Sequence, residues 1–581
     1  MRTRILTKFI VITVLSYAGY GSAAELNGLP SAAQRNLDRL EREKQQQTIQ
    51  AEKQRERRIQ QSEIEKEKDN TTKGEASRFH FFIKEIVIED DDKYEFSAQR
   101  NAILARYLNT DMGKQEILML TKELNDFYIG RGYATTQVTI VPGSLRTGKL
   151  VMKVLWGKIA DFRHNGEAPG WREKMRMFSA MPFAKDKRLN IKDIDQGLDN
   201  LLRVSSTDKL LIEPDSQHGY SIINHTENGI FPLSINVGMN NSGYRDAGWY
   251  QYYLNTALKN VLGLNDTLTW YYSYNDLNAE DDNQLAKSLS FSLPLGYWLF
   301  DTSYYKSNYK KTIGGMYGGY VSDGHAERFS LKASRTLFRD ASGKYSGWLK
   351  VEKRDNENNI MNFPVAVSSK KYSSLNAGVN WVGGLAGGWG YADLSVTAGV
   401  PWFGAAWKQD ADLNGFKLDY KKYNGSLNWS RRLSVTESGR LAVDYDFNSG
   451  FQYTNDRLVS DAKYSLGDEF SVRGFKEDIV AAERAVWIAN TIKIPVQINY
   501  ARINSIAPFA GFDMGMARHN CFSTSGNCDR DYLTGAAAGI KISGKDFSGS
   551  FTAGWPVKKP ASLKDSNVDN YALYFNLGLG F

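Results

Sequence analysis

The sequence predicts a membrane β-barrel of about 16 antiparallel strands, preceded by two small α+β domains and an N-terminal helix. Three observations lead to the barrel. Residues 227–581 hold 37 of the 51 glycines, 25 of the 32 tyrosines and 11 of the 13 tryptophans. Apolar and polar residues alternate in several segments of this region, and the chain ends in an alternating segment whose last residue is Phe581.

The alternation has a period of two residues, which gives each strand one apolar and one polar face. It is clear in residues 267–275, 288–293, 441–448 and 491–498. The strands of a water-soluble sandwich show the same alternation. The enrichment in tyrosine and tryptophan favours a membrane barrel, because aromatic girdles mark both of its interfaces with water.

The C-terminal segment is typical of the last strand of a bacterial outer-membrane barrel. Tyr571, Phe575 and Phe581 occupy odd positions together with three leucines. A terminal Phe on such a strand resembles the signal recognised by the barrel-assembly machinery, which we expect as a partner during biogenesis. At roughly 20–24 residues per strand and connection, residues 227–581 provide about 15–18 strands, and even numbers are the rule.

The composition of the whole chain excludes two classes of protein. The 581 residues have a formal net charge of +8 and a mean hydropathy of −0.46. This hydropathy excludes a bundle of membrane helices but not a barrel, in which apolar and polar residues average out. The charge is small for such a long chain, whereas a nucleic-acid binder shows a denser basic stripe. We therefore expect no nucleic-acid partner.

Residues 1–24 have the pattern of an export signal peptide. Arg2, Arg4 and Lys8 precede the apolar run 9–15, and the small residues that follow fit cleavage after residue 24. The apolar run is too short to span a bilayer. We therefore expect an exported protein. The resemblance of the C-terminal segment to outer-membrane barrels implies the Gram-negative outer membrane as its location, with the N-terminal domains in the periplasm.

The two cysteines, Cys521 and Cys528, lie close together. The spacing predicts a small disulfide-closed loop in an oxidising compartment, and two unrelated free thiols are the alternative. Two cysteines cannot form a tetrahedral zinc site alone, and the six histidines show no metal-ligand spacing. No metal and no cofactor are expected.

Residues 31–73 differ from the rest of the chain. They carry 11 basic and 9 acidic residues, eight glutamines and no aromatic residue, and Leu37 and Leu40 form a small apolar patch. We predict a polar helix within residues 25–53, followed by a solvated linker over 54–76. A helix that is polar on all sides cannot be a core element. From composition alone, a disordered spacer is favoured over a helix inside a water-filled cavity.

Residues 79–226 predict two α+β units, with domain limits at 77–155 and 156–226. Both units show the order strand, helix, helix, strand, strand, which indicates a duplicated module. A short sheet of this kind leaves an open edge strand that can accept a strand from another chain. The alternative is that both are packing domains without a partner.

No enzymatic constellation stands out, and we expect no enzyme activity. Residues 539–545 match the first seven positions of a phosphate loop, but Asp546 stands where Ser or Thr should bind magnesium. The same segment alternates like a strand.

The most informative motif is Val472-Arg473-Gly474-Phe475. It resembles the loop tetrad of the Omp85 superfamily of barrels, in which Val-Arg-Gly is followed by Tyr or Phe. About forty residues on, the segment 508–515 resembles the strand that receives this loop, with Phe512, Asp513 and Gly515 inside it. The resemblance implies that Arg473 reaches into the lumen and pairs with Asp513 on the barrel wall.

With two upstream modules, the chain resembles the TpsB transporters of two-partner secretion, the haemolysin secretion/activation family. Phe475 replaces the commoner Tyr, and Asn490-Thr491 stands where many members carry an acidic residue. Further segments match the family in the first module, in the second module and in the first barrel hairpin: 132–136, 189–200, 241–243 and 260–266.

The resemblance implies two POTRA-type domains and an N-terminal helix that plugs the barrel, which reverses the preference for a disordered spacer. It also implies a single large secreted TpsA-type partner, outer-membrane lipid around a monomer, and a haemolysin, an adhesin or a contact-dependent inhibition toxin as cargo. An assembly factor for other barrels is the alternative function. A passive porin explains the barrel but not residues 79–226.

Overall fold

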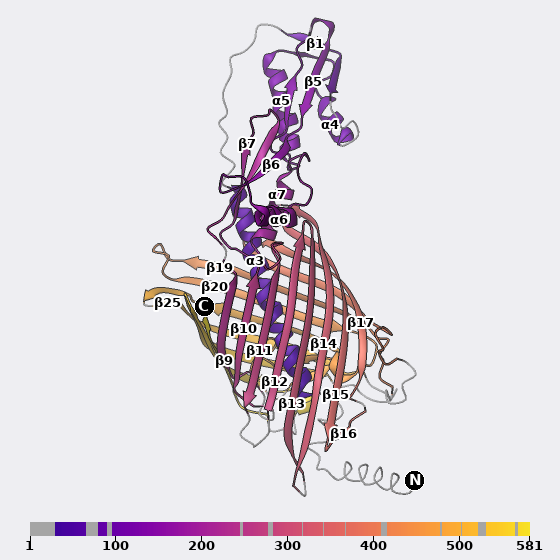
Figure 1. Ribbon diagram of the computed structural model, residues 1–581, viewed down its shortest axis with the longest axis vertical. Coiled ribbons are helices and arrows are strands. Elements are labelled where there is room, and N and C mark those ends of the chain that lie inside the picture. The colour runs from indigo at the N-terminus through magenta and orange to yellow at the C-terminus, as the bar shows by residue number, and fades with distance from the viewer. Residues whose placement is uncertain are drawn as a thin grey trace.

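The computed structural model shows a long barrel with two small domains stacked on one end (Figure 1). It describes residues 30–581 with the exception of 65–79, 90–95, 144, 230, 244–247, 277–282, 316–317, 341, 367, 408–414, 477–478, 501, 521–529 and 564–567. The predicted signal peptide and the predicted Cys521–Cys528 disulfide lie outside the described residues. Among the described residues, no helix combines the length and the apolarity needed to cross a bilayer.

The N-terminal helix α3 (Ala32–Ile64) is longer than the sequence predicted. Its first turn is capped by Ser31, whose hydroxyl oxygen accepts a hydrogen bond from the Gln34 amide at 3.2 Å. The prediction that the helix ends at residue 53 was wrong. Residues 54–64 contain no Gly or Pro and consist mostly of good helix formers. Ile59 is buried within this extension, so tertiary packing stabilises it.

The first α+β domain has the predicted order, except that the first strand is divided into β1 and β2 and a short strand, β3, is added between the two helices. A three-stranded sheet of order β2-β5-β4 packs against α5, and its buried residues include Leu120, Leu124 and Met152. Strands β2 and β4 are the edges of this sheet. The elements are β1 (Phe81–Ile83), β2 (Glu85–Glu89), α4 (Ser97–Leu104), β3 (Thr110–Met112), α5 (Lys114–Ile129), β4 (Gln137–Ile140) and β5 (Lys149–Leu155).

The second domain repeats this order and forms a sheet of order β6-β8-β7, with β6 and β7 as its edges. Its helix α7 is capped by Asn190, whose side chain accepts a hydrogen bond from the Lys192 amide at 2.9 Å. The elements are β6 (Lys158–His164), α6 (Trp171–Ala180), α7 (Ile191–Leu201), β7 (Lys209–Pro214) and β8 (Tyr220–Thr226).

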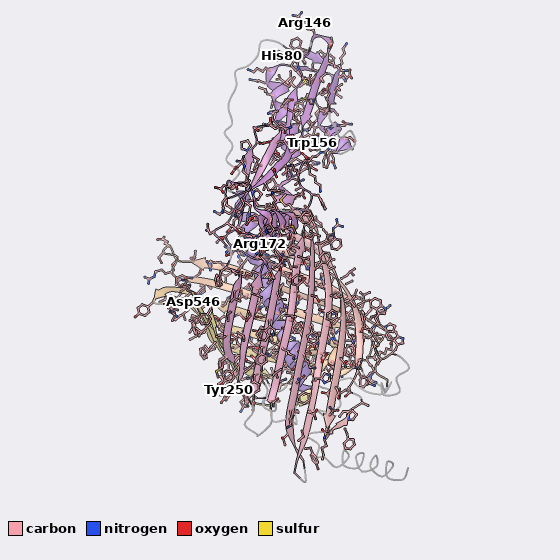
Figure 2. The ribbon with its side chains drawn as sticks, viewed as in Figure 1. His80, Arg146, Trp156, Arg172, Tyr250 and Asp546 are labelled. Atoms are coloured by element: carbon pink, nitrogen blue, oxygen red, sulfur yellow. The ribbon has the colours of Figure 1, made fainter. Side chains whose placement is uncertain are left out.

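Contacts at Trp156 fix the two domains against each other, and Figure 2 labels this residue between them. Trp156 packs edge-on against Tyr128 and Tyr133, with ring centroids 5.3 and 5.0 Å apart. The Arg188 guanidinium of the second domain lies 4.0 Å from the Trp156 ring centroid. In addition, the Ile191 amide donates to the Gly132 carbonyl at 2.8 Å. The two domains therefore join through specific contacts.

The C-terminal region is a closed antiparallel barrel of sixteen long strands, as predicted, with the short strands β16 (Phe363–Pro364) and β24 (Val496–Tyr500) added to it. The first and last long strands close the sheet. The long strands are β9 (Leu233–Asn240), β10 (Gln251–Lys259), β11 (Thr267–Asp276), β12 (Asn283–Leu295), β13 (Trp298–Gly315), β14 (Gly318–Asp340), β15 (Gly343–Ile360), β17 (Lys371–Leu385), β18 (Gly388–Val400), β19 (Lys421–Val435), β20 (Ala442–Tyr453), β23 (Arg484–Lys493), β25 (Ile503–Arg518), β26 (Arg530–Gly544), β27 (Phe547–Lys558) and β28 (Ala572–Gly580).

The two faces of the barrel wall differ as the alternation predicts. Large apolar side chains such as Trp270, Phe300 and Leu349 are about half exposed on the outer face. Polar side chains such as Arg328 and Glu352 are buried in the interior. The barrel therefore presents an apolar surface to lipid and encloses a polar lumen.

The predicted continuous strand over residues 491–498 is interrupted. Strand β23 ends at Lys493, and β24 begins at Val496 after Ile494 and Pro495. Proline has no N–H to donate to a sheet, which accounts for the break. Ile492 remains half exposed on the outer face, in agreement with the predicted sidedness.

The seam between β28 and β9 can be tested at Gly238. A Cβ atom there would lie 2.3 Å from the backbone carbonyl oxygen of Leu577. We expect Gly238→Ala to destabilise closure by about 1–3 kcal/mol, because the crowding cannot be relieved by a side-chain rotation. Gly580→Ala on the same seam is the control, since nothing lies within 4 Å of its Cβ. Heat-modifiability on a denaturing gel measures the folded fraction, and equal loss in both variants would contradict the prediction.

Candidate functional site

Helix α3 lies inside the barrel and passes through its lumen (Figure 1). Its side chains contact strands on different sides of the wall. The Arg39 guanidinium donates to the side chain of Gln251 on β10, and Arg328 on β14 donates to Glu41. Farther along, the Lys53 ammonium donates to the Ser430 hydroxyl on β19 at 3.5 Å. A helix about 10–12 Å across obstructs much of a lumen of this size.

The first third of α3 is held mainly by charge. The buried Arg328 guanidinium lies 2.7 Å from Asp38 and also contacts Glu41. Lys350 lies 3.4 Å from Glu41. Apolar residues of the first turns also contribute, with Leu37 buried in a small cluster with two tyrosines of β13, and Ile49 and Ile59 are buried farther along the helix. The plug is therefore a polar body in a polar lumen.

The end of α3 nearest the α+β domains is fixed by Asp199, a fully buried carboxylate on α7. Its carboxylate forms ion pairs with three cations: Arg55 of α3 at 3.1 Å, Arg339 of β14 at 3.1 Å and Lys344 of β15 at 2.8 Å. Burial acts to raise the pKa of Asp199. The facing cations, Lys344 first, outweigh burial and hold the pKa well below its ordinary value. Asp199 is therefore an anionic junction between plug, barrel and second domain.

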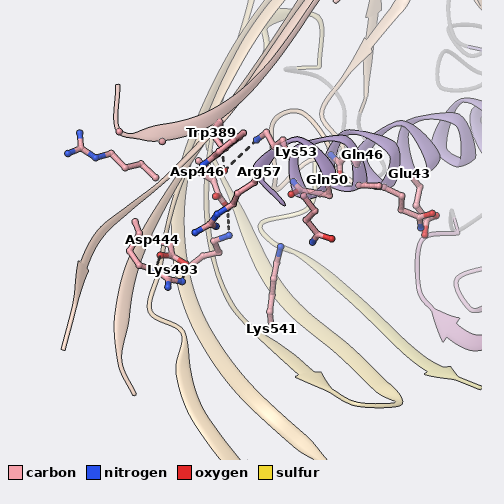
Figure 3. Close-up of a pocket in the computed structure, with 18 residues that line it drawn as sticks. Glu43, Gln46, Gln50, Lys53, Arg57, Trp389, Asp444, Asp446, Lys493 and Lys541 are labelled. Atoms are coloured by element: carbon pink, nitrogen blue, oxygen red, sulfur yellow. Dashed lines mark hydrogen bonds and ion pairs between the residues drawn. The ribbon is translucent and has the colours of Figure 1, made fainter. Parts of the chain in front are cut away.

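The plug leaves part of the lumen open. A cavity of about 860 Å³ lies beside α3, between the helix and the strands from β18 to β26 (Figure 3). Figure 3 shows Lys493 and Asp446 together on the wall and Lys541 projecting toward the helix. The residues that line the cavity are mostly charged or amide-bearing, among them Glu43, Gln46, Gln50, Lys53, Arg57, Asp444, Asp446, Lys493 and Lys541. Water and ions can fill such a space.

The described residues between β20 and β23, which are 454–476 and 479–483, fold back into the barrel and are called the lumen loop. It contains the short antiparallel strands β21 (Tyr464–Leu466) and β22 (Val480–Ala482). Val472 and Phe475 at its tip are almost fully buried in an apolar cluster with residues of the wall. The loop is thus anchored to the wall by its motif residues.

The structure brings Arg473 and Asp513 together in a two-pronged contact. The Arg473 Nε and Nη2 atoms donate to Oδ2 and Oδ1 of Asp513, each at 2.6 Å, and the Arg473 amide donates to Oδ2 at 3.0 Å. Asp513 is fully buried. The Asn490 carbonyl and the Thr491 hydroxyl also accept from Nη2, at 3.3 and 3.1 Å. Besides the Asp513 carboxylate, the guanidinium thus has two uncharged acceptors.

Beneath the motif, the wall is lined by glycines that the sequence reasoning did not single out, apart from Gly515. A Cβ on Gly535 would lie 1.9 Å from the Arg473 carbonyl oxygen, and one on Gly511 would lie 2.2 Å from its Nη2. Gly515 and Gly554 are similarly close to Val472 and Gly474. Gly474 itself has a φ of 110°, which favours glycine. The missing side chains let the loop lie directly on the backbone of β25, β26 and β27.

The loop also reaches the seam of the barrel and the plug. The Gly474 amide donates to the Tyr574 hydroxyl of β28 at 3.3 Å, and Lys476 donates to the Asn241 carbonyl beyond β9. Asp468 forms an ion pair with Arg42 of the plug. The lumen loop therefore connects the receiving wall, the closing strands and α3.

Other predicted site residues are placed elsewhere. Phe512 does not face the loop: its side chain is on the outer face and 41% exposed. Tyr571 and Phe581 are exposed at opposite ends of β28, and Phe575 stacks on Phe551 with ring centroids 6.2 Å apart. The predicted match at 260–266 forms the turn between β10 and β11, rather than part of the first hairpin.

One group of potential metal ligands occurs among the described residues, in the second domain. The ligand atoms of Asp208, His225 and Glu227 lie within 4.8 Å of one another. The Arg176 guanidinium already pairs with Asp208 at 2.7 Å and with Glu227. Its Nε also donates to Asn265 in the β10–β11 turn at 3.0 Å. This group is an ion-pair cluster at the junction with the barrel.

Comparison with known proteins agrees with this architecture. The model of the haemolysin secretion/activation protein family ShlB/FhaC/HecB matches residues 219–542. Two POTRA-domain models match the upstream domains, the ShlB-type model over residues 81–157 and a second over 158–214.

Individual relatives are distant but cover most of the chain. The outer membrane transporter CdiB of Dickeya dadantii is 28% identical over 492 residues, covering 83% of each chain. The hemolysin transporter protein ShlB of Serratia marcescens is 27% identical over 412 residues, covering 70% of each chain.

Among solved structures, CdiB from Escherichia coli superposes with a TM-score of 0.85 at 24% identity, over 95% of this chain and 99% of that one. This likeness concerns the fold. Together with the family model, which covers more than half of the chain, it leads to one assignment. The chain belongs to the haemolysin secretion/activation family, the outer-membrane transporters of two-partner secretion.

Proposed function

We propose that this transporter passes one large, unfolded exoprotein from the periplasm to the cell surface, through the space that α3 now occupies. The observation that carries the proposal is the polar helix in the lumen, held by ion pairs that water can replace. The edge strands of the α+β domains, such as β4 and β7, offer backbone groups to an extended chain. Folding of the cargo outside would supply the direction, without a cofactor or enzymatic step.

Of the possible cargo classes, we favour a contact-dependent inhibition toxin over a haemolysin or an adhesin, on overall likeness to the CdiB relatives. Lipid surrounds the barrel, the barrel-assembly machinery inserts it, and a monomer suffices because the plug, loop and wall all come from one chain.

The alternative function is an assembly factor that inserts other barrels. Two upstream domains and the plug favour secretion. Depletion of the transporter separates the two functions. We expect loss of one surface exoprotein and unchanged levels of other outer-membrane proteins, measured by mass spectrometry of outer-membrane and culture fractions. A general fall in barrel proteins would support the assembly function instead.

We further propose that the pair of Arg473 and Asp513 keeps the lumen loop in the position that secretion requires. Arginine can contact both carboxylate oxygens at once, which lysine cannot reproduce. The loop tip around this pair is buried. Removing one partner therefore leaves the charge of the other partner buried and unpaired. Because the apolar cluster around Val472 persists, the barrel itself should remain closed.

We expect Arg473→Ala to leave a folded barrel and to reduce secretion sharply. Removing one partner of a buried pair costs about 3–5 kcal/mol, somewhat less in a wet lumen. Arg432→Ala is the matched control, because Arg432 makes a two-pronged contact with Asp444 at 2.8 and 3.2 Å but is exposed. Exposed pairs contribute about 0–1 kcal/mol. Wild-type secretion by a folded Arg473→Ala protein would remove the proposed role.

The junction at Asp199 is expected to hold the plug in place. Asp199→Asn keeps the side-chain shape but removes the charge that faces Arg55, Arg339 and Lys344. We expect a higher conductance in planar bilayers, between that of the wild type and that of a variant lacking residues 32–64. Asp186→Asn, at an exposed site of the same domain, is the control. Wild-type conductance of both the Asp199→Asn and the deletion variants would contradict a plugging role for α3.

A further inference from the structure

Helix α6 of the second domain has three distinct faces, and two of them are occupied. Met177 and Ala180 are buried in the core of the domain. Ser179 and Arg176 contact the rim of the barrel. The Ser179 hydroxyl donates to the carbonyls of Leu264 and Pro294, at 2.6 and 2.8 Å. The helix is thereby fixed directly on the β10–β11 and β12–β13 turns.

The third face of α6 is apolar and mostly exposed. Trp171, Met175 and Phe178 follow one another at helical spacing, and Trp171 is 70% exposed. Phe183, which is 75% exposed, packs edge-on against Phe178 with ring centroids 5.2 Å apart. Two such exposed aromatic residues are costly on a surface that only water touches.

This apolar face points away from the barrel axis. Helix α7 packs on α6 from the other side and carries Asp199, which faces the lumen and the plug. Figure 1 shows α6 directly above the ends of the barrel strands in the foreground. The direction opposite to α7 is therefore that of the surrounding membrane, rather than that of the pore.

The face continues into the outer surface of the barrel. Next to Met175 lies Gly263, in a turn that also exposes Val261 and Leu262. On the other side, Pro182 lies against Gly296, and the strand that follows exposes Trp298 and Phe300 toward lipid. The aromatic residues of α6 and of the barrel thus form one apolar surface at the level where the barrel leaves the bilayer.

We propose that Trp171, Phe178 and Phe183 insert into the headgroup region of the periplasmic leaflet and anchor the second domain to the membrane. Tryptophan and other aromatic residues favour this interface, and an amphipathic helix can lie in its plane. Lys174, exposed on the same helix, can reach lipid phosphates. The second domain is then held at a fixed height over the rim, independently of cargo. This inference goes beyond the transport function and rests only on the barrel being embedded in a bilayer.

The test uses the full chain in vesicles of phosphatidylethanolamine and phosphatidylglycerol. A cysteine introduced by Trp171→Cys or Phe178→Cys, in a C521S/C528S background, carries an environment-sensitive NBD label. We expect blue-shifted emission that is quenched by a nitroxide placed on the lipid headgroup or high on the acyl chain. Both positions are exposed, so neither substitution removes a core contact. Heat-modifiability confirms that each labelled barrel is folded.

Phe82→Cys supplies the matched control, because Phe82 is also an exposed aromatic residue but belongs to the first domain, away from the rim. Its label should be unaffected by spin-labelled lipid. Quenching at positions 171 and 178 no stronger than at position 82 would overturn the proposal. Insensitivity to lipid, combined with a blue shift on adding reduced, carboxymethylated α-lactalbumin, would overturn it in favour of a site for unfolded polypeptide.

Discussion

A sheet edge inside a membrane cannot find water for its hydrogen bonds, so the sheet must close on itself. In this chain closure depends on the antiparallel pairing of residues 576–580 with residues 236–240. Once the sheet is closed, the alternation of side chains sends apolar groups to lipid and polar groups inward. The lumen is therefore polar, and a segment inside the barrel meets mainly polar and charged side chains of the wall. The plug, the loop and the cavity all obey this constraint.

The two bodies in the lumen meet this constraint in different ways. Helix α3 uses ion pairs and hydrogen bonds along most of its length, and when the helix leaves, both partners of each pair become hydrated, which offsets the loss of the contact. The lumen loop instead brings its own apolar cluster, with Val472 and Phe475 buried against the wall, and adds one desolvated pair, Arg473 with Asp513. The helix is therefore suited to leave the lumen, and the loop is suited to stay in it. Arg42 and Asp468 link them, so the departure of the helix breaks a contact close to the tip of the loop.

Local patterns predicted the fold well, and the contacts between distant segments less well. Period-2 alternation and strand-helix order are local properties, so the barrel and both α+β domains could be predicted. The length of α3 was underestimated, because residues 54–64 are stabilised by groups such as Asp199 that lie far away in the sequence. The glycines beneath the loop, such as Gly535, also gave no signal, since their role depends on which strands are neighbours. The motif resemblance identified Arg473 and Asp513, but Phe512 in the same segment faces outward.

The contacts of α3 are arranged in series along its axis, from Arg39 near one end to Arg58 near the other. Because Arg55 and Arg58 bind the second domain, a pull exerted by that domain acts on one end of the helix first. The contacts between the helix and the wall can then break one after another. The barrier to opening is then set by the buried ion-pair clusters at Asp199 and Arg328, which break one after the other, rather than by the simultaneous loss of all contacts. A plug with many bonds can therefore be both secure at rest and quick to release.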